Sequence, residues 1–123
     1  MYILLVDDNP MMQQVMLRFL KGLGYEVGIA GSAREAVALA RQSPPALILI
    51  DLYLPDTDGP EALQELRTLP GCAEVPAIAI SGMNREDAHG VEEAGFSEFL
   101  TKPVDLDDLA KTVFRYMPPP PVE

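Results

Sequence analysis

Three short segments of the sequence contain only apolar residues, and this feature constrains the fold more than any other. The segments are Tyr2–Val6, Ala46–Ile50 and Ala77–Ile80. Strands that are apolar at every position are typical of parallel sheets that helices cover on both faces. Two further segments, Tyr25–Ala30 and Phe96–Thr101, alternate or mix polar and apolar residues. We predict that these two are edge strands.

Helical patterns with recognisable starting signals follow each of these segments. Pro10 comes after Asp8-Asn9 and suits the first position of a helix. Ser32 with Glu35 forms a capping-box pattern at the start of a second helix. Three more helices are predicted to begin at Asp58-Gly59-Pro60, at Asn84 (closing at Gly95) and at Asp105 with Asp108.

Strict alternation of strands and helices with short connections predicts an α/β fold. We expect a flavodoxin-like, doubly wound (βα)5 domain with a parallel five-stranded sheet in the order 2-1-3-4-5. In this order the three apolar strands are neighbours in the centre of the sheet, and the two mixed strands form its edges.

The length of 123 residues fits one domain. We expect residues 1–117 to form that domain and residues 118–123, with the run Pro118–Pro121, to be a proline-rich tail or a linker remnant. No apolar run approaches the roughly 20 residues of a membrane helix. No basic segment precedes Tyr2, which argues against a secretory signal, so neither a membrane nor a secreted protein is expected.

The formal net charge of −10 disfavours direct binding to nucleic acid, because like charges repel. Cys72 is the only cysteine and His89 the only histidine. An intrachain disulfide and a Cys/His zinc site are therefore excluded, and a cytoplasmic location is expected. We interpret Cys72 as a loop thiol and His89 as a solvated side chain.

Polar side chains stand where four of the predicted strands end. The first strand ends in Asp7-Asp8, the third in Asp51, the fourth in Ser81 and the fifth in Thr101-Lys102. Because ligands of parallel sheets bind beyond the carboxyl ends of the strands, these side chains are expected to converge on one edge of the sheet.

Three converging carboxylates resist ionisation unless a cation offsets their repulsion. Mg²⁺ fits, since it takes carboxylate, water and phosphate oxygens as ligands. A lysine cannot bind the metal, but it can pair with a phosphoryl oxygen. The set therefore suits phosphoryl transfer, in which positioning and charge neutralisation supply most of the catalysis. An aspartate is a competent acceptor.

Each of these residues also has a plainer interpretation. Asp8 alone could cap a helix, and Asp51 alone could be a turn residue before Leu54-Pro55. Ser81 with Gly82 could be an ordinary turn, and Lys102 with Pro103 a plain loop. The occurrence of all five side chains at strand ends favours the functional interpretation.

The sequence resembles the receiver domain of two-component response regulators. The matching residues are the LLVDD run that ends in Asp7-Asp8, the stretch from Asp51 to Gly59, the pair Ser81-Gly82, and Thr101-Lys102-Pro103. The resemblance implies that the chain takes a phosphoryl group from a histidine kinase or a histidine phosphotransfer protein. It implies a downstream effector protein, or an effector domain absent from this chain. It implies no conventional enzyme, although the chain would catalyse its own phosphorylation and dephosphorylation.

The resemblance also implies a role for each matching residue. Asp51 would accept the phosphoryl group and, with Asp8 and the backbone carbonyl of Tyr53, bind Mg²⁺ or Mn²⁺. Asp7 would assist indirectly. Ser81 would hydrogen-bond the phosphoryl group and Lys102 would pair with it. The Lys102–Pro103 bond would be cis. Phe99 would move inward with Ser81 and change the surface of the fourth helix, fifth strand and fifth helix.

Four further expectations concern tuning and partners. Phe99 lacks the hydroxyl of the tyrosine often found there, so the signal would travel by packing. Tyr53 and Met83 are bulky and are predicted to slow self-dephosphorylation. Gly90 is predicted to weaken the fourth helix by up to ~1 kcal/mol, or to be a harmless surface glycine. Met11, with Gln14, would face the donor protein, whereas Met12, Val15, Met16, Phe19 and Leu20 are predicted to face the core.

Three other functions compete with this one. A receiver-like protein-binding module that works without phosphorylation is the main alternative, but the complete acidic set argues against it. A haloacid-dehalogenase-like phosphatase would need an aspartate where Tyr53 stands. A flavodoxin-like FMN carrier would need a phosphate loop rich in Ser, Thr or Gly where this chain has Asp7-Asp8-Asn9-Pro10.

Overall fold

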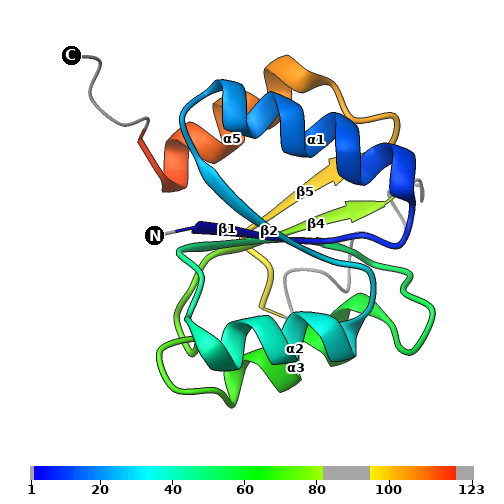
Figure 1. Ribbon diagram of the computed structural model, residues 1–123, viewed down its shortest axis with the longest axis vertical. Helices are drawn as coiled ribbons and strands as arrows, with labels where there is room; N and C mark the ends of the chain where they lie inside the picture. The colour runs from blue at the N-terminus through cyan, green and yellow to red at the C-terminus, as the bar shows by residue number, and fades with distance from the viewer. Residues whose placement is uncertain (1, 82–94, 119–123) are drawn as a thin grey trace.

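The computed structural model describes residues 2–81 and 95–118, which form a single parallel sheet with helices on both faces (Figure 1). The sheet has five strands in the order β2-β1-β3-β4-β5, as the sequence predicts. The strands are β1 (Tyr2–Val6), β2 (Glu26–Ala30), β3 (Leu47–Asp51), β4 (Ala77–Ser81) and β5 (Glu98–Thr101). All four pairings are parallel.

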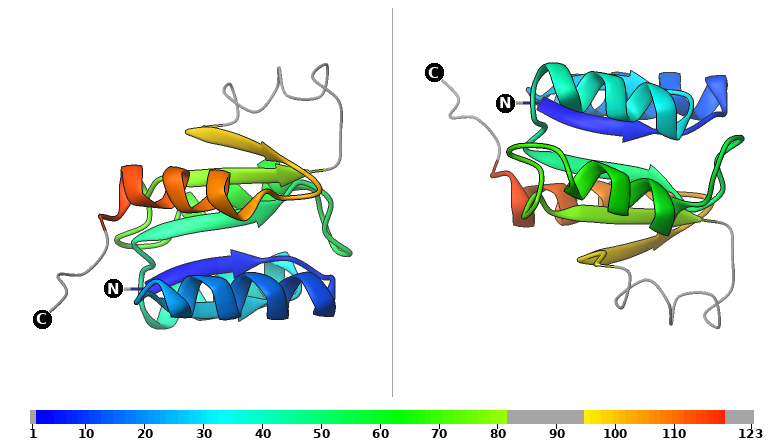
Figure 2. Two further views of the ribbon diagram at one scale, coloured as in Figure 1. Left: turned by 90° about the horizontal axis from the view of Figure 1, so that it is seen from above. Right: turned by 90° about the horizontal axis from the view of Figure 1, so that it is seen from below.

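Helices of the described residues cover both faces of the sheet, two on each face (Figures 1 and 2). Helices α1 (Pro10–Gly22) and α5 (Leu106–Tyr116) lie on one face, and α2 (Ala33–Gln42) and α3 (Gly59–Arg67) lie on the other. The predicted fourth helix, with Gly90, Met83 and His89, falls outside the described residues, as do residues 119–123 of the proline-rich tail. Among the described residues, no helix is long and apolar enough to cross a membrane.

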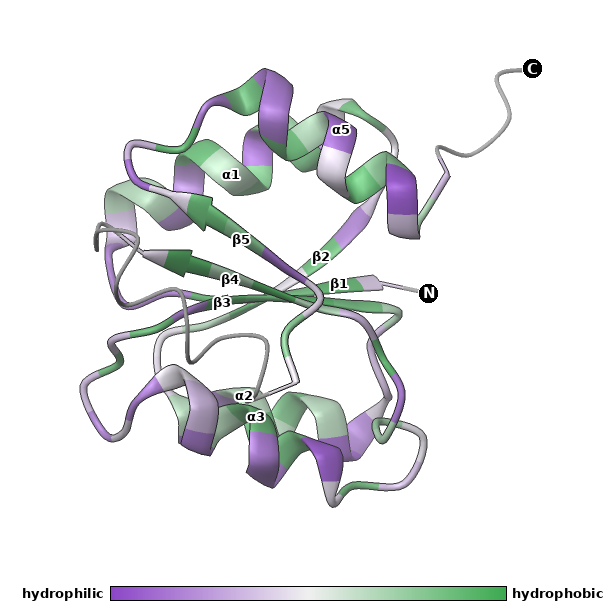
Figure 3. Cartoon of the chain, turned by 180° about the vertical axis from the view of Figure 1, so that it is seen from behind, coloured by the Kyte–Doolittle hydropathy of each residue, from purple (hydrophilic) through white to green (hydrophobic). Residues whose placement is uncertain are grey.

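The central strands separate two hydrophobic cores. In β1, Ile3 and Leu5 pack toward α1 and α5, whereas Leu4 and Val6 pack toward α2 and α3. Every residue of β3 and β4 is buried, and the apolar colouring of these strands is plain in Figure 3. Burial on both faces is the physical reason why these strands are apolar at every position before their last residues, Asp51 and Ser81. Truncating such a side chain, as in Leu49→Ala, would cost about 2–5 kcal/mol of stability.

Side-chain caps fix where each described helix begins. Asn9 caps α1, Ser32 caps α2, Asp58 caps α3 and Asp105 caps α5, each by accepting backbone N–H groups of the first turn. A cap of this kind contributes about 1 kcal/mol. The capping box predicted for α2 is only half formed, because the Glu35 carboxylate accepts from the N–H of Gly31 instead of Ser32.

One prediction about burial is wrong. The apolar pattern predicts that Val15 belongs to the inward stripe of α1, but its side chain is 44% exposed. The helix buries Met16 and Leu20, and the stripe that centres on them leaves Val15 at its solvent edge. Cys72 lies in a loop, as predicted, and its side chain is fully buried in the core between the sheet and α3. The loop turns inward at Cys72, and the backbone carbonyl of Cys72 accepts a hydrogen bond from Arg67 Nη1 at 3.1 Å.

Candidate functional site

The carboxyl ends of β1 and β3 bring three carboxylates together. Oxygen atoms of Asp7, Asp8 and Asp51 lie within 4.8 Å of one another. Asp7 and Asp8 directly follow β1, and Asp51 is the last residue of β3. Because β1 and β3 are parallel neighbours, their ends meet at one edge of the sheet. The convergence that the sequence predicts is therefore present.

Lys102 enters the same edge from the end of β5. Its Nζ lies 2.7 Å from Asp51 Oδ2 and 3.8 Å from Asp7 Oδ2. Its backbone N–H donates to the carbonyl of Ser81 at 2.8 Å, which ties the end of β5 to the end of β4. Ser81 is buried beside this contact, and the Lys102–Pro103 peptide bond is cis, as expected.

The charge of Lys102 is held in place by its surroundings. Partial burial acts to lower the pKa of the ammonium, but the hydrogen bond to Asp51 and the nearby charges of Asp51, Asp7 and Asp8 outweigh it and raise the pKa. Lys102 is therefore a permanent cation at neutral pH. A fixed positive charge beside three carboxylates can stabilise an anionic group that arrives from outside.

Asp7 is the least satisfied member of the cluster. Its side chain is 1% exposed, and Oδ1 accepts the N–H of Asn9 at 2.9 Å, yet Oδ2 has no hydrogen-bond donor among the described residues. Burial raises the pKa of this carboxyl, and the charges of Asp51 and Asp8 add to the rise, against the opposing effects of the Asn9 N–H and Lys102. A buried oxygen without a donor, next to two further carboxylates, fits a divalent cation.

Asp51 has both carboxylate oxygens engaged. Oδ1 accepts the N–H of Tyr53 at 2.9 Å, and Oδ2 accepts from Lys102. The bond to Tyr53 is a turn of the kind that the plainer interpretation of Asp51 allows, so this residue shapes its loop and also joins the cluster. The plainer interpretation of Asp8 is wrong, because Asn9 and not Asp8 caps α1.

The loop between β3 and α3 is closed at its base by two backbone hydrogen bonds. Leu54 N donates to Thr57 O at 3.1 Å and Gly59 N donates to Leu52 O at 2.7 Å, so that Tyr53 and Asp58 face each other as an isolated bridge. A Cβ atom at Gly59 would stand 2.9 Å from Leu52 Cα, a distance that real Cβ atoms do not reach. Only glycine permits this closure, and neither bond uses the carbonyl of Tyr53.

The family comparison agrees with this geometry. The family model of the response regulator receiver domain matches residues 3–114. The chain belongs to this family. A receiver domain is the phosphoacceptor module of two-component signalling, and its family generally binds Mg²⁺ and interacts with histidine kinases and effectors.

Individual relatives of the receiver domain differ in context. An uncharacterized 14.6 kDa protein of Leptolyngbya boryana is 37% identical and covers 94% of this chain and 89% of that protein. Protein PilH of Pseudomonas aeruginosa is 33% identical, and the match covers 90% of this chain and 93% of PilH. The solved receiver domain of sensor histidine kinase PA1611 from the same species, which has a magnesium ion in its active site cleft, is 34% identical. It superposes with a TM-score of 0.85 and covers 94% and 95% of the two chains.

Two supporting residues of this receiver domain were not predicted. The Gln13 amide nitrogen donates to the carbonyl of Asp7 and so fixes the backbone between the two acidic residues. Asp56 bonds to the start of α2 from the loop after β3. The first contact spans six residues and could be sought in the first turns of α1. The second joins distant segments, and no local pattern signals it.

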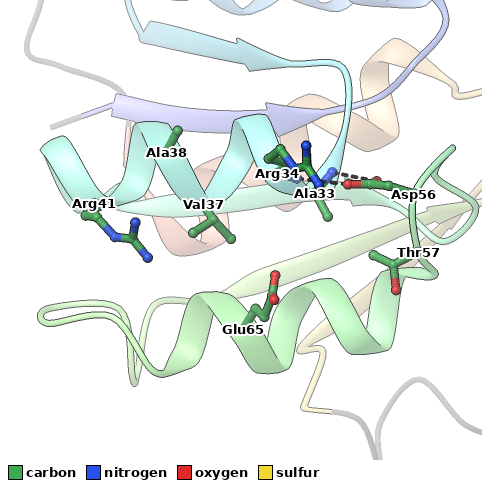
Figure 4. Close-up of a pocket in the computed structure, with 8 residues that line it drawn as sticks. All are labelled: Ala33, Arg34, Val37, Ala38, Arg41, Asp56, Thr57 and Glu65. Atoms are coloured by element: carbon green, nitrogen blue, oxygen red, sulfur yellow. Dashed lines mark hydrogen bonds between the residues drawn. The ribbon is translucent and has the colours of Figure 1, made fainter.

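The receiver domain also has a surface groove between α2 and α3 (Figure 4). Its volume is about 390 Å³, and its lining residues are Ala33, Arg34, Val37, Ala38, Arg41, Asp56, Thr57 and Glu65. None of these side chains belongs to the predicted site, so the groove and the acidic cluster are separate features.

Proposed function

We propose that Asp51 is the residue that accepts the phosphoryl group. The observation that carries this proposal is the position of Asp51 between Lys102, at 2.7 Å, and the carboxylates of Asp7 and Asp8. Lys102 holds one carboxylate oxygen and the N–H of Tyr53 holds the other, so the acceptor is oriented before the donor arrives. Such positioning is the main contribution that a protein makes to phosphoryl transfer.

Asp8, Asp51 and the backbone carbonyl of Tyr53 would hold the divalent cation, with Asp7 assisting indirectly. Asp8 is exposed and can meet an ion directly, whereas Asp7 is buried behind it. When bound, Mg²⁺ (or Mn²⁺) would offset the repulsion among the carboxylates and the negative charge of the phosphoryl oxygens.

The transfer forms one bond and breaks one bond. A carboxylate oxygen of Asp51 bonds to phosphorus, and the bond from phosphorus to the donor's imidazole nitrogen breaks, with the electron pair leaving on that nitrogen. The ammonium of Lys102 then pairs with a phosphoryl oxygen in place of the Asp51 oxygen. The hydroxyl of Ser81 donates to a second phosphoryl oxygen.

The change of surface would follow from Ser81. Phe99 lies in the middle of β5, partly buried against the core between the sheet and α3. Its backbone pairs with Ala79 of β4, two residues before Ser81, so a shift of Ser81 is transmitted along β4 to the Phe99 ring by packing. The surface of β5, α5 and the segment between β4 and β5 would then bind a downstream effector protein or domain.

The donor would be a histidine kinase or a histidine phosphotransfer protein. Met11, Val15 and Tyr53 are the large apolar side chains exposed in the described part of the chain, at 76%, 44% and 58%. Met11 and Tyr53 lie within four residues of Asp8 and Asp51 in sequence, which favours a docking surface around the cluster. Met11→Ala should slow transfer from a phosphorylated histidine protein and leave transfer from acetyl phosphate unchanged. A cytoplasmic location and the absence of direct nucleic-acid binding stay predictions.

The test is the intact mass of the protein after incubation with acetyl phosphate, with and without Mg²⁺. We expect the mass of one phosphoryl group to be gained only with Mg²⁺, and not by Asp51→Asn. This variant keeps the shape of the side chain, so a loss of phosphorylation would not reflect misfolding. If the parent protein gains no mass under either condition, the alternative of a binding module that works without phosphorylation replaces this proposal.

A further inference from the structure

Asp56 lies in the loop between β3 and α3, but its carboxylate bonds to a different helix. Oδ1 accepts the N–H of Ala33 at 3.0 Å and Oδ2 accepts the N–H of Arg34 at 3.1 Å. Both donors belong to the first turn of α2, and Figure 4 shows the carboxylate facing them. A single side chain thus joins the loop that follows Asp51 to α2, the helix that connects β2 and β3.

This contact is strong for an exposed carboxylate. The first N–H groups of a helix have no partner within the helix, and they favour a negative charge. The hydrogen bond from Ala33 lowers the pKa of Asp56, and the bond and charge of Arg34 add to this. Asp56 is therefore ionised at neutral pH, and both of its oxygens stay available to α2.

The start of α2 is also held by its own residues. Ser32 Oγ accepts the N–H of Glu35 at 3.2 Å, and the Glu35 carboxylate accepts the N–H of Gly31. Ser32 stabilises the helix without any contact to the loop, whereas Asp56 contributes both to the helix and to the loop. The two caps of one helix therefore allow the two contributions to be separated by experiment.

The loop is held at its base by backbone hydrogen bonds and at its outer part by Asp56. Its base is closed by the bonds from Leu54 to Thr57 and from Gly59 to Leu52, and Asp56 fixes its outer part to α2. Tyr53 lies at the closed base, between Asp51 and the part that Asp56 holds. Without Asp56 the segment from Tyr53 to Thr57 would lose its attachment to α2 and keep only contacts within the loop and to its flanking residues Asp51 and Glu61. The carbonyl of Tyr53 would then be less firmly oriented.

We propose that Asp56 is a positioning residue, which fixes the Tyr53 carbonyl in its metal-binding orientation by clamping the loop after β3 onto α2. This inference rests on the proposed function, because it assigns that carbonyl to the metal. The proposal adds a residue that would touch neither the metal nor the phosphoryl group. It links the geometry of the site to the first turn of α2.

The experiment compares Asp56→Ala with Ser32→Ala, which removes a cap of the same helix without touching the loop. Asp56→Asn is the conservative variant, since its amide oxygen can still accept one of the two bonds. Three quantities are measured on each full chain: the melting temperature, the dissociation constant for Mg²⁺ alone, and the hydrogen-exchange rates of the Leu54 and Gly59 amides without metal.

We expect both alanine variants to melt at lower temperature, but only Asp56→Ala to bind Mg²⁺ more weakly, by about tenfold, as when outer partners of metal ligands are removed. Only Asp56→Ala should speed exchange at Leu54 and Gly59, and Asp56→Asn should lie between it and the parent. Equal Mg²⁺ affinities and exchange rates in Asp56→Ala and Ser32→Ala would overturn the inference and leave Asp56 as a helix cap. If the parent protein itself does not bind Mg²⁺, the proposed function fails first, and the exchange rates alone then decide whether Asp56 clamps the loop.

Discussion

The two loops that hold Asp51 do so by different means. The loop after β3 holds Oδ1 through the N–H of Tyr53, and backbone hydrogen bonds and a close approach of Gly59 to Leu52 brace it. The loop after β5 holds Oδ2 through the ammonium of Lys102. One side of the acceptor is thus set by backbone geometry and the other by charge. Changes in the first loop should alter stability and metal binding, whereas changes in the second should alter the rate of transfer.

The largest effect is expected where charge is removed. Lys102→Ala leaves Asp51 beside Asp7 and Asp8 without the lysine's neutralising charge, and it takes away the cation proposed to pair with the phosphoryl group. We expect phosphorylation by acetyl phosphate to slow by about 10²-fold, in line with the loss of one preorganised electrostatic partner. The measurement is the initial rate of mass gain with Mg²⁺ present. Lys111→Ala, on the exposed side of α5, is the matched control, and similar rates in both variants would remove Lys102 from the mechanism.

The next prediction concerns the loop after β3, which backbone hydrogen bonds and Gly59 brace. Gly59→Ala would place a methyl group 2.9 Å from Leu52 Cα and 2.8 Å from Leu52 Cδ2, so the loop must shift. We expect a loss of about 1–3 kcal/mol in the free energy of unfolding, measured with urea. Gly22→Ala serves as the control, because a methyl group there would meet no heavy atom within 4 Å beyond its own stretch of helix, and it should be neutral or stabilising. An unchanged stability in Gly59→Ala would show that the loop is not braced there.

A smaller effect is expected from the buried carboxylate. Burial raises the pKa of Asp7, so ionisation of this group destabilises the metal-free fold, and the destabilisation grows as the pH rises from the usual Asp range through that raised pKa. Asp7→Asn removes the buried charge. We expect the metal-free variant to be more stable at pH 7 by on the order of 1 kcal/mol, and the difference to vanish below the usual range of Asp pKa values, near pH 3.

The same substitution should weaken Mg²⁺ binding, because it removes a negative charge from the cluster. Urea unfolding at several pH values, with and without Mg²⁺, measures both effects in one series. A variant that is less stable than the parent at pH 7 without metal would contradict the view that the buried charge of Asp7 destabilises the metal-free fold.

The smallest effect concerns the lifetime of the phosphorylated state. Tyr53 lies two residues after Asp51, and Tyr53 is 58% exposed. If a bulky group at this position hinders the approach of water, as we propose, Tyr53→Ala should lose its phosphoryl group about threefold faster, which corresponds to ~0.7 kcal/mol in the barrier. Tyr53→Phe keeps the bulk and should decay like the parent. Equal decay in all three proteins, followed by intact mass, would reject a role for the side chain.

Most of the fold was predictable because burial leaves a direct trace in the sequence. The segments Tyr2–Val6 and Ala77–Ile80 are apolar at every position since both faces of these strands are covered. The convergence of Asp7, Asp8, Asp51 and Lys102 was predictable for a related reason: parallel strands end at one edge, so residues at their ends must meet.

The features that sequence did not predict depend on contacts between distant segments. The exposure of Val15 depends on how α1 packs against the sheet and α5. Helical periodicity alone cannot distinguish the middle of an apolar stripe from its edge. The burial of Cys72 follows from the path of a loop. The hydrogen bond that the Ala33 N–H donates to Asp56 joins residues 23 positions apart, and no local sequence pattern near either residue predicts it.

The identity of the acceptor carboxylate decides the rest of the mechanism, because the phosphoryl group should arrive at Asp51 and at no other carboxylate of the cluster. Borohydride reduces an acyl phosphate of aspartate to homoserine, so peptide mass spectrometry after phosphorylation and reduction identifies the residue that was modified. We expect homoserine at position 51 alone, dependent on Mg²⁺ during phosphorylation. Homoserine at position 7 or 8, or phosphorylated protein without homoserine at position 51, would contradict the account.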